Sequence, residues 1–388
     1  RYLSKYKLKS RNNVLLLGVK FYNSNNESEQ GPGSYGSDAD FKFYRNEFPN
    51  YFNQSKYNYP NVNYAFFGEN IFYFSEKFSV TPGFRFEYIK TKSDGFYKKI
   101  NVDAAGNVIL NQTIDDSEIR KRNFILLGFG LSYKISRNIE LYSNISENYR
   151  SVTFADISIS NPAYSINPEI SDENGFTYDI GFRGDYLKKV SFDVGFFSLF
   201  YNDRIGFVQK AYSDGRVKSE KGNVGNAVIY GLESLIDFDL NEMFIKNNDL
   251  SMNFFVNSSL INSEYTESEV PGVKGREVEF VPNLNFKSGL KFGLKNLVMN
   301  LQYTYLSKQF TDASNANDGN LSGVIGQIPK YSILDFSSSY TLKKIKLEMG
   351  VNNLLNEYYF TRRATGYPGP GIIPSEPRSF YLTIQIKI

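Results

Sequence analysis

The sequence predicts an all-β fold, an antiparallel β-barrel that crosses a membrane. Apolar and polar residues alternate in segments from one end of the chain to the other, which is the period of a strand with two different faces. Short turns and long loops join these segments in strict succession. Aromatic residues make up 16% of the chain, yet no stretch approaches the roughly 18 apolar residues of a membrane helix. A membrane barrel accounts for all three observations, because its lipid-facing and lumen-facing residues alternate and aromatic girdles mark its interfaces.

Composition excludes several other classes of protein. The net charge of +3 is too small to indicate a nucleic-acid-binding protein. Histidine and cysteine are both absent, which removes disulfides, thiol chemistry and the commonest metal ligand and general base. No nucleophile and base pair, phosphate loop or zinc spacing occurs in the sequence. We therefore expect neither an enzyme nor a cofactor.

Fourteen predicted strands follow a strand fragment at residues 1–8. The alternation is clear in residues 190–196, where Val190, Phe192, Val194 and Phe196 oppose Ser191, Asp193 and Gly195. Short turns separate 63–74 from 78–90 and 123–135 from 139–149, whereas long loops are expected at 23–61, 91–121 and 202–226. The predicted strands are 15–22, 63–74, 78–90, 123–135, 139–149, 176–186, 190–201, 228–240, 250–263, 278–295, 297–308, 331–342, 344–353 and 380–388.

The last two strands form a closing hairpin with a continuous apolar face. Ile345, Leu347, Met349 and Val351 lie on one face of residues 344–353, and residues 380–388 alternate in the same way. Because outer-membrane barrels place short turns in the periplasm and long loops outside the cell, the final strand ends on the periplasmic side. Counted back from there, every long loop is extracellular.

Five segments resemble TonB-dependent outer-membrane receptors. They occur in the family's order and extend over more than three quarters of the chain. The resemblance is closest to ferric-dicitrate and siderophore receptors of Bacteroidetes-like bacteria. One departure is Ile388, where the family usually ends in Phe. The segments are TPGFRFEY (81–88), SENYRSVTF (146–154), NPEISDENGFTYDIGFRG (167–184), VNNLLNEYYFTRR (351–363) and GYPGPGIIPSEPRSFYLTIQIKI (366–388).

The resemblance implies a multi-pass protein of the outer membrane whose whole barrel has 22 strands and an N-terminal plug. About 14–15 strands are present here, so residues 1–388 are expected to be the C-terminal part of the barrel, with the plug and the first strands outside this sequence. The implied function is TonB-dependent import of a ferric chelate. The implied partners are the TonB–ExbB–ExbD complex through the plug, the ferric chelate, outer-membrane lipid and lipopolysaccharide, and a surface lipoprotein, with no nucleic acid.

Arginines in or beside the predicted extracellular loops are candidate substrate contacts. Guanidinium groups bind carboxylates through two parallel hydrogen bonds, which suits an anionic ferric chelate. Ion pairs between loops, or contacts with lipopolysaccharide, are the alternative for each of them. The candidates are Arg363, Arg150, Arg362, Arg378, Arg204 and Arg216.

Other interpretations stay open at this point. An aromatic loop at residues 35–59, with Phe41, Phe43, Phe52 and Tyr57 among its rings, suits a SusC-like importer of glycans or peptides that works with a lipoprotein lid. A passive 14-stranded porin is a further alternative. On the inner face, Arg85 and Glu87 are expected to form an ion pair that lines the lumen.

Overall fold

The computed structural model describes residues 1–33, 48–52, 54–103, 105–153, 164–211, 217–320, 323–364 and 371–387. Almost all regular structure in these residues is β-strand, and their one helix is a five-residue π-helix, η1 (Asn241–Ile245). The main sheet contains 16 strands. The predicted all-β, antiparallel fold is confirmed.

The chain divides into two compact units. The first comprises Arg1–Phe72 and Thr81–Leu127, and the second comprises Tyr73–Val80 and Gly128–Ile388. The first unit holds β1 (Tyr2–Leu8) and β2 (Arg11–Gln30), together with most of β3 (Ser55–Tyr73), β4 (Phe78–Val102) and β5 (Val108–Lys134).

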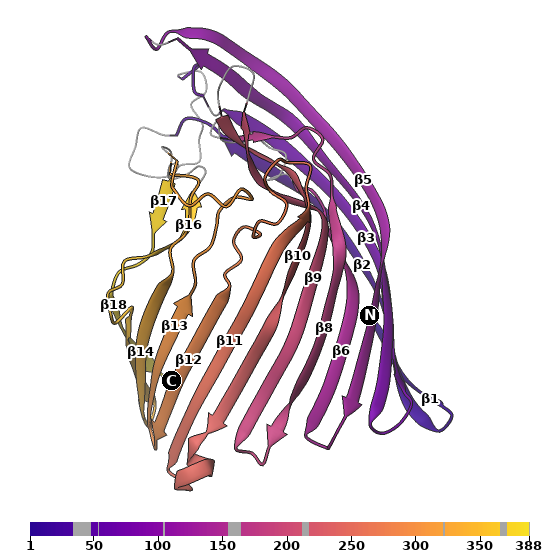
Figure 1. The fold of residues 1–388 in the computed structure, drawn as a ribbon, viewed down its shortest axis with the longest axis vertical. Helices are drawn as coiled ribbons and strands as arrows, with labels where there is room; N and C mark the ends of the chain where they lie inside the picture. The colour runs from indigo at the N-terminus through magenta and orange to yellow at the C-terminus, as the bar shows by residue number, and fades with distance from the viewer. Residues whose placement is uncertain are drawn as a thin grey trace. The chain divides into compact units, whose positions relative to one another are not determined.

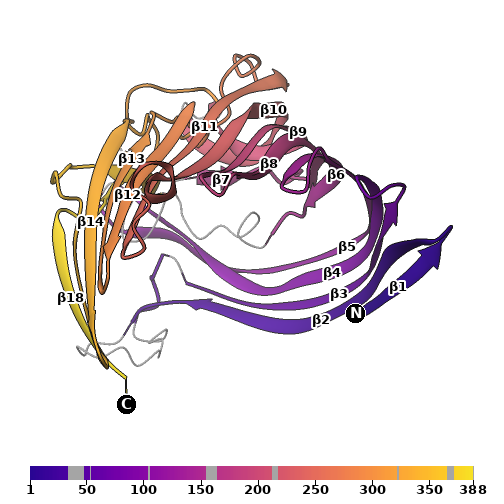
Figure 2. The ribbon, with the colours of Figure 1, turned by 90° about the horizontal axis from the view of Figure 1, so that it is seen from below.

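The second unit continues from the end of β5 and holds the remaining elements of the chain. Figure 1 shows β6 and β8 to β14 side by side, and Figure 2 shows that β7 lies on the concave side of their curve. The elements are β6 (Ile139–Arg150), β7 (Tyr164–Ile166), β8 (Glu173–Tyr186), β9 (Val190–Ala211), β10 (Val217–Asp239), η1, β11 (Leu250–Glu267), β12 (Leu284–Leu294), β13 (Leu297–Leu306), β14 (Tyr331–Leu342), β15 (Ile345–Asn352), β16 (Phe360–Ala364), β17 (Gly371–Pro374) and β18 (Ser379–Ile386).

Strand pairing follows the order of the chain. The main sheet runs β1-β2-β3-β4-β5-β6-β8-β9-β10-β11-β12-β13-β14-β15-β18, and β7 pairs in parallel with β10. Each predicted strand, including the fragment at residues 1–8, overlaps one strand of this path. The closing hairpin is also confirmed, because β15 pairs antiparallel with β18 from Ile345 opposite Ile386 to Asn352 opposite Ser379.

The two faces of the second unit differ in chemistry. Cross-strand pairing places Phe254, Leu290, Leu301 and Phe336 in one row over four neighbouring strands. The adjacent row on the other face contains Gly289, Gln302 and Asp335. Large apolar side chains on the first face are exposed, including Leu382 at 69% and Phe380 at 75%. An exposed apolar face of this extent is the face that a membrane barrel presents to lipid.

In the first unit, aromatic rings cover one face. Phe21 lies 5.0 Å from Tyr64 between ring centroids, and Tyr64 lies 6.3 Å from Tyr88. On the other face, Arg85 and Glu87 form an ion pair, as expected for a polar lumen wall. Cross-strand aromatic contacts of this kind stabilise a sheet beyond the area they bury.

Three of the predicted long loops are wrong in part, because strands extend into them. β4 and β5 pass through residues 91–121, β2 and β3 shorten the loop at 23–61, and β9 and β10 leave only residues 212–216 between them. A membrane-crossing strand needs about 9–11 residues, so β4 and β5, at 25 and 27 residues, continue well beyond a bilayer. Water on both sides of such an extension imposes no apolar alternation, which is why the pattern was not visible in the sequence.

The start of the strand predicted at 278–295 is also wrong. Residues 278–283 belong to a folded loop, and β12 begins at Leu284. Val278 is 1% exposed within a small core, and Phe280 has a φ of 61°, a left-handed conformation that interrupts a strand. Tertiary packing therefore overrides the alternation of REVEFV in this segment.

Candidate ligand-binding surface at the loop ends of the strands

Two loops of the second unit fold back onto the strand ends and create a core there. Residues 268–283 follow β11 and residues 307–330 follow β13. Tyr265 and Ala313 are completely buried, and Val224, Val273 and Val278 pack with them. Backbone hydrogen bonds join the Ala313 amide to the Phe207 carbonyl at 3.1 Å and the Phe280 amide to the Phe310 carbonyl at 2.9 Å. These loops therefore form a packed surface over the ends of β9 to β11.

A buried ion pair holds the first of these loops. Nη2 of Arg204 lies 3.7 Å from Oε1 of Glu279, and the two side chains are 18% and 3% exposed. Tyr265 donates a hydrogen bond to the other carboxylate oxygen of Glu279 at 2.7 Å. Arg204 also lies over the ring of Tyr201, 5.4 Å from its centroid. The charge of Arg204 is thus directed at the protein.

Glu173 contacts Arg150 and the backbone of Ile205, the residue that follows Arg204. Its Oε2 accepts a 2.8 Å hydrogen bond from the Ile205 amide and lies 3.3 Å from Nη1 of Arg150. The carboxylate is 5% exposed, whereas the Arg150 side chain is 42% exposed. Arg150 is therefore anchored to a buried carboxylate, while its side chain as a whole is partly exposed.

Arg363, in β16, binds the neighbouring loop at 307–330. Its Nη1 donates to the Gly323 carbonyl and its Nη2 donates to the Gln327 carbonyl, both at 2.9 Å. The guanidinium also lies over the ring of Phe360, 5.3 Å from the centroid. Burial lowers the pKa of this group, although an arginine stays charged at any physiological pH. Two of its three nitrogens are occupied by the loop at 307–330, so Arg363 fastens β16 to that loop.

The remaining candidates lie apart from this network. Arg362 and Arg378 are exposed, and within the described part of the chain neither forms an ion pair. Arg216 lies outside the described residues. Glu173 therefore links Arg150 to Ile205, which follows Arg204 in the chain, and Arg363 binds the loop at 307–330.

A pocket of about 770 Å³ opens beside this network. Its wall includes the ends of β9 and β10 and the first residues of the loop at 268–283. The polar groups are mostly amides and carboxylates, among them Asp203, Asn226, Glu267 and Glu269. Among the described residues of its wall the one cation is Lys210, which is paired with Glu220 at 2.8 and 3.0 Å. The pocket offers hydrogen-bond donors and acceptors, with little positive charge left over for an anion.

Sequence reasoning missed Glu279, Tyr265 and the pocket. Glu173 lies inside the segment 167–184 that carries the family resemblance, and that motif was the one signal that pointed to it. Glu279 and Tyr265 carry no local signal, because their roles arise when two segments of the chain pack together. No cluster of three or more metal-ligating His, Cys, Asp or Glu side chains occurs among the described residues.

The aromatic loop expected at 35–59 is described only in part, and the first unit contains that part. Phe41 and Phe43 lie outside the described residues. Tyr57 and Tyr59 are 7% and 8% exposed and stack on each other at 5.7 Å. The Tyr57 hydroxyl donates to Asp116 at 3.1 Å, and burial together with that carboxylate raises the pKa of Tyr57. These two rings pack internally.

The comparisons with known proteins define the class. Residues 2–354 match the family described as TonB dependent receptor-like, beta-barrel. The chain belongs to this family and is a multi-pass β-barrel protein of the outer membrane, in a family of receptors and transporters and not of enzymes. No helix in the described part of the chain is both long and apolar enough to cross a membrane. No curated protein matches the chain.

Solved structures with the same fold include several receptors and transporters. The ferric citrate transporter FecA in its unliganded form has a TM-score of 0.74 at 18% identity, over 99% of this chain and 53% of that chain. The ferric yersiniabactin uptake receptor FyuA from Yersinia pestis gives 0.70 at 15%, over 98% and 52%. The ferric-catecholate import receptor Fiu from K12 E. coli, in its closed form, gives 0.70 at 15%, over 99% and 53%. The chain spans about half the length of these structures.

Proposed function

We propose that the whole protein imports a ferric chelate, such as ferric citrate or a siderophore complex, across the outer membrane with energy delivered by TonB. The family match over residues 2–354 carries this proposal. The similar folds of FecA and FyuA, whose names refer to ferric citrate and ferric yersiniabactin, favour an iron chelate as substrate. The chain contributes the barrel wall and the extracellular loop surface.

The proposal includes a plug and further strands outside residues 1–388. The chain spans 53% of FecA, and the family resemblance implies a 22-stranded barrel closed by an N-terminal plug. In the proposed cycle, substrate binds above the plug, and the TonB–ExbB–ExbD complex acts on the plug to open a path through the lumen. No covalent chemistry is involved.

Within the loop surface, we assign different roles to the candidate arginines. Arg362 and Arg378 have exposed side chains that can reach an anionic ligand, and Arg150, which is paired with Glu173, is assigned to the same surface because its side chain is 42% exposed. Arg204 and Arg363 hold loops in place. Arg204 faces the carboxylate of Glu279, and Arg363 donates to the carbonyls of Gly323 and Gln327. Arg204 and Arg363 thus support the loop surface on which the exposed arginines bind the ligand.

Uptake in a deletion strain tests the proposal. The full-length gene is deleted, and uptake of radioactive iron is measured with ferric citrate, ferric siderophores and inorganic iron at micromolar concentration. Loss of uptake from one ferric chelate, restored by the plasmid-borne gene and absent again in a strain without TonB, is the expected result. Unchanged uptake from every ferric source would exclude an iron chelate, and uptake that persists without TonB would favour a passive porin.

A SusC-like importer of glycans or peptides is the second candidate. Its support is the aromatic loop at 35–59, in which Phe52 is 51% exposed. The same deletion strain distinguishes the two, because this candidate predicts defective growth on a glycan or peptide source with normal iron uptake. A surface lipoprotein that copurifies with the receptor would also favour it.

A further inference from the structure

The short turns of the second unit contain lysines in an unfavourable backbone conformation. Lys188, Lys295 and Lys343 have φ values of 57°, 51° and 52°, and Lys246, which caps the helix η1 in the longer connection from β10 to β11, has a φ of 54°. This left-handed region suits glycine and asparagine, whereas other L-residues crowd their own backbone there. Two-residue hairpin turns normally use Asn-Gly or Asp-Gly for this reason. The repeated use of lysine indicates that its charge serves a purpose that the turn itself does not require.

The turns form one continuous edge of this unit. Figure 1 shows them together at the lower end of the strands. A backbone hydrogen bond connects each turn to the next strand or turn along the edge, with lengths from 2.7 to 3.0 Å. These bonds run from Lys134 N to Lys77 O, Asp185 N to Asn138 O, Asp239 N to Lys189 O, Lys295 N to Asp249 O, Thr341 N to Asn296 O and Lys387 N to Lys344 O.

Exposed cations follow this edge from end to end. They are the lysine and arginine side chains of the turns and of the chain end, and within the described part of the chain none of them forms an ion pair with a carboxylate. The acidic residues of the same turns and of the strand ends that bond to them are Glu76, Asp185, Asp239, Glu242 and Asp249, and the cations outnumber them. We call the following set the basic rim: Lys77, Arg137, Lys188, Lys246, Lys295, Lys343, Lys344 and Lys387.

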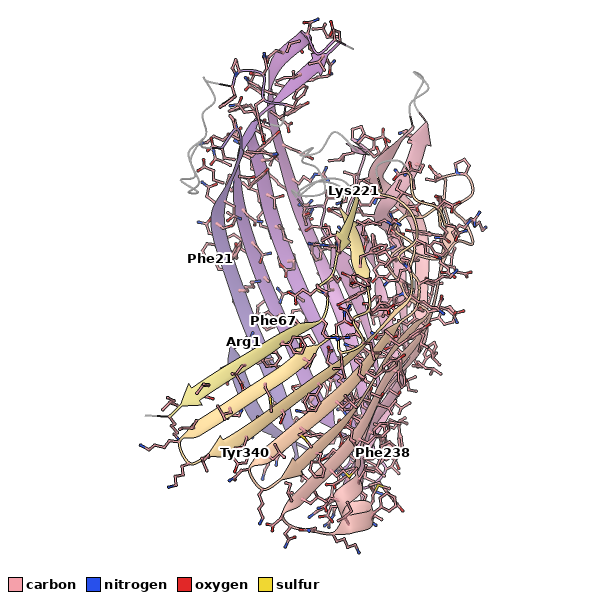
Figure 3. All side chains as sticks on the ribbon, turned by 90° about the vertical axis from the view of Figure 1, so that its left-hand side faces the viewer. Arg1, Phe21, Phe67, Lys221, Phe238 and Tyr340 are labelled. Carbon is pink, nitrogen blue, oxygen red and sulfur yellow. The ribbon has the colours of Figure 1, made fainter. Side chains whose placement is uncertain are left out.

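The basic rim lies directly below the lipid-facing aromatic side chains. Phe182 stacks on Phe192 at 5.0 Å and Phe238 stacks on Phe254 at 6.3 Å, each pair close to a short turn. Figure 3 places Phe238 and Tyr340 towards the turn end of the unit and Lys221 towards the opposite end. Aromatic girdles mark the boundary between hydrocarbon and headgroups. The rim therefore lies at headgroup level on the side with short turns, which is the periplasmic side.

We propose that the basic rim binds the phosphate groups of anionic phospholipids in the periplasmic leaflet of the outer membrane. Its cations are distributed along the whole edge, with at least one in each short turn, which matches a lipid surface better than a compact protein epitope. Flexible lysine stems extend sideways from such positions to reach headgroups, and basic residues next to a bilayer are attracted to anionic lipid. The proposal depends on membrane insertion alone and is independent of the transported substrate.

Asparagine substitutions separate lipid binding from folding. The rim variant carries Lys188→Asn, Lys295→Asn and Lys343→Asn, because asparagine accepts the left-handed conformation and keeps the turns intact. The control variant carries Lys274→Asn, Lys308→Asn and Lys330→Asn, three exposed lysines of the loop end with the same total charge change. Full-length protein is reconstituted in phosphatidylcholine vesicles, and the association of spin-labelled phosphatidylglycerol is compared with that of spin-labelled phosphatidylcholine.

The expected result is a preference of the parent protein for phosphatidylglycerol that falls by about threefold or more in the rim variant. The control variant keeps the preference, and 0.5 M NaCl weakens it in the parent by screening. The rim variant folds at least as completely as the parent, as measured by its resistance to unfolding in sodium dodecyl sulfate. An unchanged preference in the rim variant, or an equal loss in both variants, would overturn the proposal.

Discussion

At the scale of single residues, the arginines differ in what their nitrogens already bind. Arg363 donates to two carbonyls of a neighbouring loop, and Arg204 faces Glu279 within a buried core. Arg362 and Arg378 remain exposed. A buried guanidinium with protein partners has little to offer a ligand, since a new contact would first have to break an existing one. Arginines that bind the protein and arginines that are exposed should therefore respond differently to substitution.

Replacement of Arg363 by methionine should loosen β16 and the loop at 307–330. Both carbonyls, Gly323 O and Gln327 O, lose a charged donor, and hydrogen bonds of this kind contribute roughly 1.5–3 kcal/mol each. Amide hydrogen exchange followed by mass spectrometry should show about tenfold or faster exchange in residues 323–328. The exposed neighbour provides the control, and Arg362→Met should leave this exchange unchanged. Equal protection in the Arg363 variant would contradict the fastening role.

Replacement of Glu279 by glutamine should release the loop at 268–283. The Tyr265 hydroxyl keeps an acceptor, but the buried guanidinium of Arg204 loses its counter-charge, which typically costs about 3–5 kcal/mol. Trypsin should then cleave faster after Lys274 and Arg276, which lie in this loop. Glu269→Gln is the matched control, because Glu269 is an exposed residue of the same loop. Cleavage at the parent rate in the Glu279 variant would show that the ion pair does not hold the loop.

The exposed arginines should determine affinity for an anionic substrate. The double substitution Arg362→Gln and Arg378→Gln should weaken binding of the transported ferric chelate by about tenfold, because each guanidinium contributes charge-assisted hydrogen bonds. Equilibrium binding of radioactive chelate to whole cells measures the effect. Lys330→Gln, another exposed cation at the loop end, serves as control. Equal affinity in the double variant and the parent would remove both arginines from the binding surface.

The sequence predicted some residues of this surface and missed others, because a local pattern does not show which distant segments pack together. The arginines were visible because they lie in or beside predicted extracellular loops, three of them around the Gly- and Pro-rich last loop. Their partners were not, since Glu279 is separated from Arg204 by two strands and a loop, and its own segment alternates like a strand. Glu173 lies in a segment with the family resemblance but was not itself predicted, and local pattern indicated neither Tyr265 nor Glu279. Whether a charged side chain binds substrate or the protein depends on contacts that local sequence does not encode.

At the scale of elements, membrane-spanning parts of strands were predictable and their extensions were not. Lipid requires an apolar side chain at every second position, so β8, β13, β14 and the closing hairpin appear in the sequence close to their observed bounds. The extensions of β4 and β5 depend on backbone hydrogen bonds, which any side chain permits. Irregular pairing in the extensions needs glycine at particular points, and β10 has such a point at Gly225.

Substitution of Gly225 by alanine should disturb the pairing of β10 with β11. Gly225 has a φ of 153° at an irregular step in the register, and an added Cβ would lie 2.0 Å from the Glu267 carbonyl oxygen. Relief of that clash requires a backbone shift, with an expected cost of about 1–3 kcal/mol. The midpoint of urea unfolding in detergent measures it. Gly272→Ala is a control in open space, although its φ of 79° adds some strain of its own. A smaller loss for Gly225→Ala than for Gly272→Ala would contradict the role of close approach.

At the scale of the whole molecule, two faces with different solvents explain the composition. A mean hydropathy of −0.39 resembles that of a water-soluble protein, because many lipid-facing residues alternate with polar neighbours in the chain. Alternation and aromatic content predicted the membrane barrel where average hydropathy did not. The same alternation means that one step along a strand changes the solvent, and adjacent residues should tolerate charge very differently.

Leu301 and Gln302 test this difference directly. They are consecutive residues near the middle of β13, with Leu301 in the apolar row beside Leu290 and Phe336, and Gln302 in the polar row beside Asp335. Leu301→Arg places a charge near the middle of the bilayer and should destabilise the folded barrel by about 2–4 kcal/mol. Gln302→Arg faces the lumen, where water and Asp335 receive the new charge, and it should change stability by less than about 1 kcal/mol. Reversible urea unfolding of the full-length protein in phospholipid vesicles gives both values. Equal losses in the two variants would mean that the rows do not face different solvents, and a larger loss for Gln302→Arg would reverse the assignment of lipid and lumen faces.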